Sequence, residues 1–259
     1  MPAMPAGRNK SGTTSLTRAP AWRALAAHRK TWQNLHLRGL IAADPQRFAR
    51  FSAEACGLLL DYSKTLVTAE TLELLLALAR ERDLQTRIAD LLAGKRVNST
   101  EKRAAWHSAL RAGSAAPREV RRTLESMRSF AGALRAGAVK GAGGRPVTDV
   151  VSLGIGGSAL GPALAAEACT SENGLPRVHF VTTPGEALTR TLAPLDAQTT
   201  LFIIQSKSFS TQETLLNARA ARAWLQAGLG AADHGPHFAA VTAQAVAAQA
   251  FGVPQDRIF

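Results

Sequence analysis

The sequence predicts an α/β fold: a doubly wound parallel sheet with helices on both faces, preceded by a helical N-terminal region. Strand-like and helix-like segments alternate through the second half of the chain, a pattern typical of parallel strands joined by right-handed crossovers. Two turns rich in glycine or polar residues, at 154–158 and 206–211, directly follow apolar strand-like runs. The first half instead spaces its apolar residues as helices do.

The N-terminal 20 residues are predicted to form a disordered basic arm. They are rich in Pro, Gly, Ser and Thr and show no periodicity. The chain has a net charge of +12, and residues 1–50 hold nine Lys and Arg against a single acid, Asp44. No aromatic interleaving or known nucleic-acid motif accompanies this charge, so we expect a solvated arm and no nucleic-acid partner.

Residues 21–140 are predicted to form a helical region. The apolar spacing indicates helices over 21–40, 45–50, 69–82, 84–92 and 116–136. On a further helix at 98–111, Arg103, His107 and Arg111 would share one face, which is typical of a solvated charged surface. The glycine-rich turn Gly137–Pro146 predicts the boundary with a second domain, 147–259.

The second domain contains four predicted strand–helix pairs. Strands are expected at 148–155, 178–182, 199–205 and 238–242, helices at 158–169, 186–193, 212–227 and 243–251, and a further strand from Arg257. In such sheets ligands bind at the carboxyl ends of the strands, near the switch in strand order. Both marked turns follow strands directly, so the sequence predicts a ligand site there.

The first turn lies within VTDVVSLGIGGSALGP (Val147–Pro162). Gly154, Gly156 and Gly157 let the backbone bend and approach a ligand closely, and Ser158 is predicted to cap the following helix. Free N–H groups and the helix dipole would favour an anionic or polyhydroxy ligand. A plain tight connection between strand and helix is the alternative. The glycine spacing does not favour a dinucleotide site.

The second turn, SKSFST, follows the apolar run Thr199–Gln205. It places the cation of Lys207 among four hydroxyl-bearing residues: Ser206, Ser208, Ser210 and Thr211. With the N–H groups of the first helical turn they would cradle a phosphate, Lys207 acting as a point charge and the hydroxyls fixing orientation. Alternatively, Ser210 and Glu213 fit a capping box that only begins the helix.

Length and composition bound the remaining possibilities. A chain of 259 residues, 46% of them apolar, can build one large domain or two modest ones. No apolar run has the length of a membrane span, and the first residues lack a signal-peptide layout, so we expect a cytoplasmic location. Cys56 and Cys169 lie in unlike contexts and are predicted to be buried, reduced thiols without a metal or redox role.

Four segments carry a recognisable pattern: DYSK (Asp61–Lys64), NSTEKRAAWHSALR (Asn98–Arg111), GIGGSALGP (Gly154–Pro162) and SKSFSTQET (Ser206–Thr214). In order and spacing they resemble the glucose-6-phosphate isomerase family. The resemblance covers nearly all of the chain from Asp61 onward. It implies a sheet of the sugar-isomerase type, and at 98–111 a polar network that braces the sugar-binding domain.

The resemblance also implies an activity and a set of binding residues. Family members interconvert glucose 6-phosphate and fructose 6-phosphate in glycolysis and gluconeogenesis, through ring opening and an enediol, without a metal or organic cofactor. By motif, the sugar would meet Gly157 and Ser158. The phosphate would be held by Ser206, Lys207, Ser208 and Thr211, with Phe209 and Ser210 completing the loop. The family further implies a homodimer whose sites borrow residues from the partner.

The C-terminal end departs from the family pattern. Family members continue past the position matching Phe259 into a GGR segment and a second domain, which hold the catalytic glutamate, a glutamine, a histidine and a late lysine. Proton transfer needs a positioned base, and none of these residues has a counterpart here. We therefore expect an isomerase fragment, truncated within its first sugar-isomerase domain, that does not turn over substrate alone. A non-catalytic phosphosugar-binding or regulatory module is the alternative.

Overall fold

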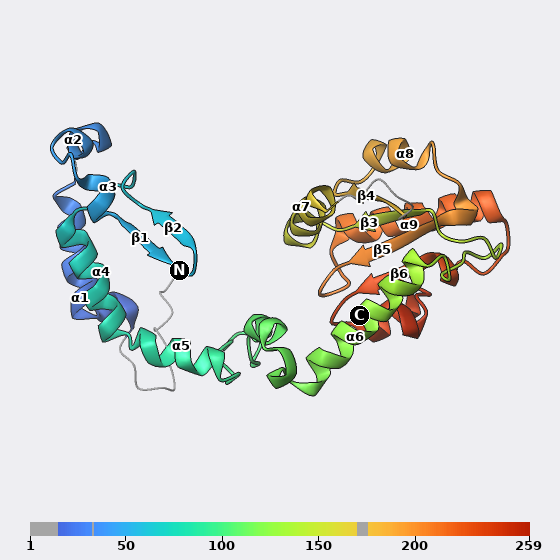
Figure 1. The fold of residues 1–259 in the computed structure, drawn as a ribbon, viewed down its shortest axis with the longest axis horizontal. Helices are drawn as coiled ribbons and strands as arrows, with labels where there is room; N and C mark the ends of the chain where they lie inside the picture. Colours follow the sequence, from blue (N-terminus) through green and yellow to red (C-terminus); the bar gives the residue numbers. More distant parts are fainter. Residues whose placement is uncertain (1–14, 33, 170–175) are drawn as a thin grey trace, which may run out of the picture. The chain divides into compact units, whose positions relative to one another are not determined.

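The computed structural model describes residues 15–32, 34–169 and 176–259 (Figure 1). The chain divides into two compact units, which meet in the sequence at Arg111 and Ala112. Most of the predicted disordered arm lies outside the described residues. Its last part is ordered, because a 3₁₀ helix spans Leu16–Arg18 and helix α1 begins at Pro20.

The first unit is largely helical. Its helices are α1 (Pro20–Lys30), α2 (Leu37–Ala42), α3 (Arg47–Arg50), α4 (Ala69–Glu81) and α5 (Leu84–Leu92), so the single helix predicted at 21–40 is two helices. α1 packs against α4, and the buried His28 of α1 lies 2.9 Å, Nε2 to Oγ1, from Thr71 of α4. The buried Arg47 guanidinium donates to three carbonyls of the segment 63–67, which ties this segment to α3.

This unit also contains a hairpin that the sequence analysis does not predict. β1 (Ser52–Ala55) pairs with β2 (Leu58–Asp61) in antiparallel register. The turn residues Cys56 and Gly57 have φ of 53° and 72°, the left-handed pair of a two-residue hairpin turn. Cys56 is exposed in this turn and Cys169 is exposed as well, so the predicted burial of both thiols is wrong.

Residues 98–111 do not form the predicted helix. Asn98 and Arg103 form an antiparallel bridge, and Asn98 Oδ1 accepts a hydrogen bond from the N–H of Glu101. An asparagine side chain that binds nearby backbone in this way competes with helix formation. Only the last six residues form a 3₁₀ helix, so the predicted common helical face of Arg103, His107 and Arg111 is absent.

The second unit contains a four-stranded parallel sheet in the order β4–β3–β5–β6, which confirms the predicted fold class. Its strands are β3 (Asp149–Leu153), β4 (Arg177–Val181), β5 (Thr200–Gln205) and β6 (Phe238–Val241). Its helices are α6 (Arg118–Arg135), α7 (Leu160–Ala168), α8 (Glu186–Leu192), α9 (Gln212–Leu229) and α10 (Ala245–Ala250). From β3 the chain passes to β4 and then returns to β5 on the other side of β3. The switch in strand order therefore lies between β3 and β5.

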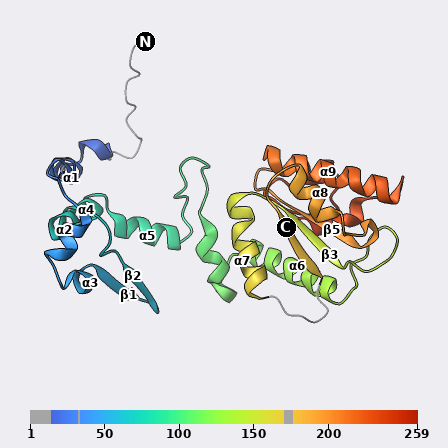
Figure 2. The same cartoon turned by 90° about the horizontal axis from the view of Figure 1, so that it is seen from above.

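Helices cover both faces of this sheet, with α8 and α9 on one side and α6 on the other (Figure 2). Val151 of β3 belongs to the core under α8 and α9, and its neighbour Val150 packs with Phe130 and Leu134 of α6. Successive strand residues thus face opposite layers. Because α6 packs on the sheet, the two units divide before it and not in the glycine-rich turn where the sequence predicts the boundary.

The strand predicted from Arg257 does not form as such: Arg257 ends a 3₁₀ helix, Gln255–Arg257, and only an isolated bridge beside β6 follows. Ile258 pairs with Ala240 in parallel. Phe259 donates its N–H to the Ala240 carbonyl and accepts the N–H of Thr242, both at 2.9 Å. Among the described residues, no helix combines the length and the apolar character that crossing a membrane requires.

Candidate ligand-binding site

The two predicted turns meet at the carboxyl edge of the sheet. β3 and β5 are neighbours, and Leu153 pairs with Ile204 in register, so both strands end side by side. A Cβ atom at Gly154 would lie 3.2 Å from the Cβ atoms of Gln205 and Ser158. Glycine at this position therefore lets the first turn pack closely against the end of β5, where the second turn begins. The two turns lie at the switch in strand order, where sheets of this kind bind ligands.

The first turn is a 3₁₀ helix, Gly156–Ser158. Helix α7 begins only at Leu160, with Ala159 as its N-cap, so the predicted capping role of Ser158 is wrong. Gly156 has a φ of 58°, a conformation that a side chain would strain. Gly156 and Gly157 are exposed, and no heavy atom lies within 4 Å of a Cβ built on either, their chain neighbours aside. The backbone of this turn is therefore open to a ligand.

The second turn is held by buried groups beneath it. Ser206 is 3% exposed, and its N–H donates to the Val241 carbonyl at 3.2 Å. Phe209 is 6% exposed, and its ring meets that of Phe251 edge-on, with centroids 6.0 Å apart. Phe209 has a φ of 49°, which a non-glycine residue adopts only where the surroundings impose it. The loop is therefore shaped by the core, before any ligand binds.

The hydroxyl groups of this turn form two pairs. Ser206 Oγ and Thr211 Oγ1 lie 3.1 Å apart, and Ser210 Oγ donates to Ser208 Oγ at 2.7 Å. Ser208, Ser210 and the side chain of Lys207 are exposed. The structure thus brings one cation and four hydroxyls together in a single loop, as the sequence predicts. Hydroxyls that now bond one another can exchange those bonds for bonds to a ligand.

Helix α9 begins directly after this loop, at Gln212, with Thr211 as its N-cap. The Thr211 side chain makes no capping hydrogen bond, and Ser210 lies outside the helix and bonds Ser208. The capping box predicted for Ser210 and Glu213 is therefore wrong. N–H groups in the first turn of a helix that lack a side-chain cap are suited to binding an anion.

Sequence reasoning missed a polar pair in the floor of the site. Gln205, the last residue of β5, donates from Nε2 to Oγ of the buried Ser152 in β3, at 2.6 Å. This bond ties the two strands together two residues before the first turn and one residue before the second. The signals in the sequence are a serine within the apolar run of β3 and a glutamine at the end of β5.

Comparison with known proteins gives three findings. Residues 61–259 match the family model described as phosphoglucose isomerase. Glucose-6-phosphate isomerases from Shewanella halifaxensis and Shewanella oneidensis are 43% and 45% identical to the chain over 258 and 259 residues. These alignments cover 95% of this chain and 47% of each relative, so the chain spans about half the length of these relatives. In fold, the chain is similar to a glucose-6-phosphate isomerase from Chlamydia trachomatis, with a TM-score of 0.66 and 24% sequence identity. This match covers 95% of this chain and 48% of that one.

Proposed function

The chain belongs to the phosphoglucose isomerase family, and we propose that it forms the phosphate-binding part of an enzyme that interconverts glucose 6-phosphate and fructose 6-phosphate. This reaction is a step of glycolysis and gluconeogenesis. The observation that carries the proposal is the meeting of two turns, 154–158 and 206–211, at the switch in strand order. One turn offers open backbone, and the other offers hydroxyls and a cation.

The phosphate group is proposed to bind the loop 206–211. Three kinds of donor converge there: the hydroxyls of Ser206, Ser208 and Thr211, the ammonium group of Lys207, and the N–H groups that begin α9. A phosphate monoester carries nearly two negative charges at neutral pH. Hydrogen bonds to a charged group are roughly twice as strong as neutral ones, so phosphate is favoured over an uncharged ligand.

The sugar is proposed to extend from the phosphate toward the first turn. The open backbone at Gly157 and the hydroxyl of Ser158 would then contact its hydroxyl groups. Moving a proton between C1 and C2 also needs a base at a suitable position and pKa. We assign no residue of these 259 to that role, because the family resemblance places the base beyond the position of Phe259.

Replacing Lys207 tests the phosphate site. K207Q removes the charge while keeping a polar side chain, so we expect fructose 6-phosphate to bind at least about tenfold more weakly, since charge-assisted bonds contribute about 1.5–3 kcal/mol each. Binding is measured by isothermal titration calorimetry. K140Q is the matched control, because Lys140 is also exposed but precedes β3 at the opposite end of the sheet. Equal weakening in both variants, or none in K207Q, would refute the proposed site.

We further propose that the whole protein is a homodimer, as the family resemblance implies, and that it acts in the cytoplasm, as the sequence predicts. Analytical ultracentrifugation of the purified protein tests the first proposal, and fractionation of cells tests the second. A monomer at working concentrations would contradict the first proposal. Recovery of the protein with membranes would contradict the second.

A further inference from the structure

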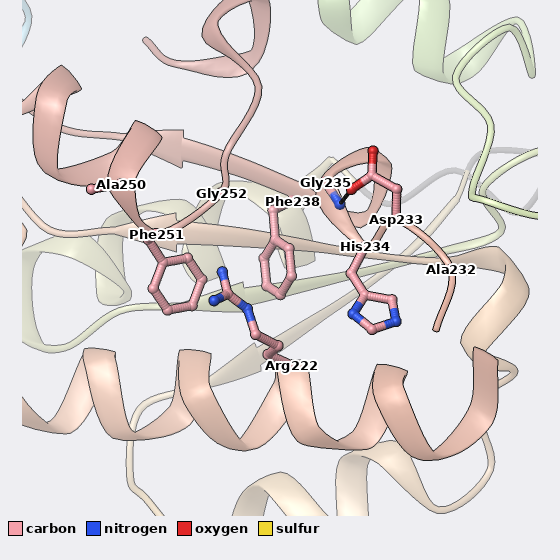
Figure 3. Close-up of a pocket in the computed structure, with 9 residues that line it drawn as sticks. All are labelled: Arg222, Ala232, Asp233, His234, Gly235, Phe238, Ala250, Phe251 and Gly252. Atoms are coloured by element: carbon pink, nitrogen blue, oxygen red, sulfur yellow. Dashed lines mark hydrogen bonds between the residues drawn. The ribbon is translucent and has the colours of Figure 1, made fainter. Parts of the chain in front are cut away.

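A cavity of about 320 Å³ lies in the second unit, apart from the proposed phosphate site (Figure 3). It is lined by Arg222 of α9, residues 232–235, Phe238 of β6 and residues 250–252. Arg222 is ten residues beyond the first residue of α9, or about 15 Å along the helix. Residues 232–235 lead into the amino end of β6, whereas the loop 206–211 follows the carboxyl end of β5.

The Arg222 side chain reaches into this cavity between two aromatic rings (Figure 3). Its Cζ atom lies 3.8 Å from the ring centroid of Phe251 and 5.7 Å from that of Phe238. A guanidinium that stacks on a ring keeps the N–H groups along its edge available for hydrogen bonds. Gly252 preserves the space, because a Cβ there would lie 3.2 Å from Arg222 Nη2 and its φ is 93°.

Within the described parts of the chain, Arg222 has no hydrogen-bond acceptor and no ion-pair partner. The carboxylate of Asp233 is directed toward Gly235 and accepts its N–H at 2.9 Å (Figure 3). Burial lowers the pKa of Arg222, but an arginine stays charged in proteins. A partly buried guanidinium without an acceptor keeps its N–H groups for a ligand, so an anion that paired with it would gain charge-assisted hydrogen bonds.

We propose that this cavity binds a small carboxylate. The parallel N–H groups of a guanidinium match the two oxygens of a carboxylate, and Phe238 and Phe251 offer apolar contact to a short carbon skeleton. Asp233 also lines the cavity, and its negative charge opposes any bound anion, so binding requires the carboxylate to lie closer to the Arg222 guanidinium than to Asp233. Cavities that hold small molecules begin at about 300 Å³, so a compact ligand fits and a large one does not.

Titration of the purified 259-residue chain with butyrate tests this site, and butyramide serves as the uncharged ligand of the same shape. We expect butyrate to bind with a dissociation constant of about 1 mM or tighter, and butyramide to bind at least about tenfold more weakly, because it cannot form the charge-assisted pair. Isothermal titration calorimetry measures both. If butyrate fails to bind, or if both ligands bind alike, the proposal is overturned.

Three variants locate the binding. R222Q is expected to weaken butyrate binding at least about tenfold. R219Q alters an exposed arginine one helical turn earlier in α9 and is expected to have no effect. A250L keeps Arg222 but narrows the cavity, so it provides the test if R222Q does not fold. Unchanged butyrate affinity in folded R222Q or in A250L would overturn the proposal. Fructose 6-phosphate binding should be the same in all three variants, which separates this site from the phosphate loop.

Discussion

Gly154 determines how closely the first turn of the proposed site packs against the end of β5, from which the second turn continues. Because a Cβ at this position would lie 3.2 Å from Gln205 and Ser158, G154A should push the turns apart and weaken fructose 6-phosphate binding about tenfold, as small misplacements in binding sites do. Titration calorimetry measures the effect. G161A is the control, because Gly161 in α7 has open space around it. Wild-type affinity in G154A would show that the spacing of the turns does not matter.

His237 is a fully buried histidine held in its neutral form. The N–H of Ala142 donates to its Nε2 at 2.8 Å, and its Nδ1 lies 2.8 Å from the Thr200 carbonyl. An N–H can donate only to an unprotonated ring nitrogen, so Nδ1 carries the single proton. Burial is the main cause that lowers the pKa of His237 below its usual 6.5. Protonation of Nε2 would break the bond to Ala142.

The stability of the chain should therefore depend on pH through His237. The contribution of neutral His237 to the free energy of unfolding is complete above about pH 6.5. It is lost as the pH falls toward the lowered pKa of the folded state, because the unfolded histidine then takes up a proton that the folded one does not. Urea unfolding between about pH 8 and pH 5 measures this slope. H237N should flatten it and cost about 2 kcal/mol at high pH.

The control for this pH dependence is H107N, which replaces an exposed histidine. It should keep both the stability and the slope of the wild type. An unchanged slope in H237N would show that another group titrates in this range.

At the scale of single residues, the sequence reveals the hydroxyl-rich loop 206–211 directly, but it does not reveal the buried partners. The loop residues 206–211 are contiguous, so their shared chemistry is visible in the sequence. His237 contacts Ala142, 95 positions away, and Arg222 meets Phe251 only after α10 has folded back. Contacts of this kind depend on the tertiary structure, and no local pattern reveals them.

Among the secondary-structure elements, β3 and β4 are joined at their amino ends by Asp149. This residue is 1% exposed and accepts hydrogen bonds from Arg177, Thr148 and His179, each at 2.9 Å. Burial raises the pKa of Asp149, but these bonds outweigh it and hold the pKa below 3.8. Its carboxylate is therefore ionised at neutral pH and anchors the edge strand β4.

Removing this charge should destabilise the sheet. We expect D149N to lower the free energy of unfolding by about 2 kcal/mol or more, since hydrogen bonds to charged groups contribute about 1.5–3 kcal/mol each. E125Q is the control, because its pair with Arg128 is exposed and should be worth about 0.5 kcal/mol or less. Denaturant unfolding measures both, and equal effects of the two variants would contradict the anchoring role.

Elements are predictable where a pattern of apolar residues matches burial. β5 is fully or partly buried along its length, and its apolar run identifies it. The β1–β2 hairpin has no such pattern, because Leu58, Leu59 and Leu60 are all exposed, and its Cys-Gly turn is not among the usual hairpin dipeptides. At 98–111 the asparagine side chain overrides the helical spacing.

For the molecule as a whole, the alternation of strands and helices predicts a parallel sheet but not its strand order. The order β4–β3–β5–β6 arises because the chain returns past its first strand, and either direction satisfies the same local pattern. That order brings the glycine turn and the hydroxyl-rich turn together. The predicted domain boundary differs from the observed division for a related reason: α6 resembles the preceding helices in sequence but packs on the sheet.

The most direct measurement is a crystal structure of the chain with fructose 6-phosphate. We predict that the phosphate lies within hydrogen-bonding distance of Lys207, Ser208 and Thr211, with the sugar directed toward Gly157 and Ser158. A phosphate bound elsewhere, for example against Arg222, with the loop 206–211 making no contact to it, would contradict the proposed phosphate site.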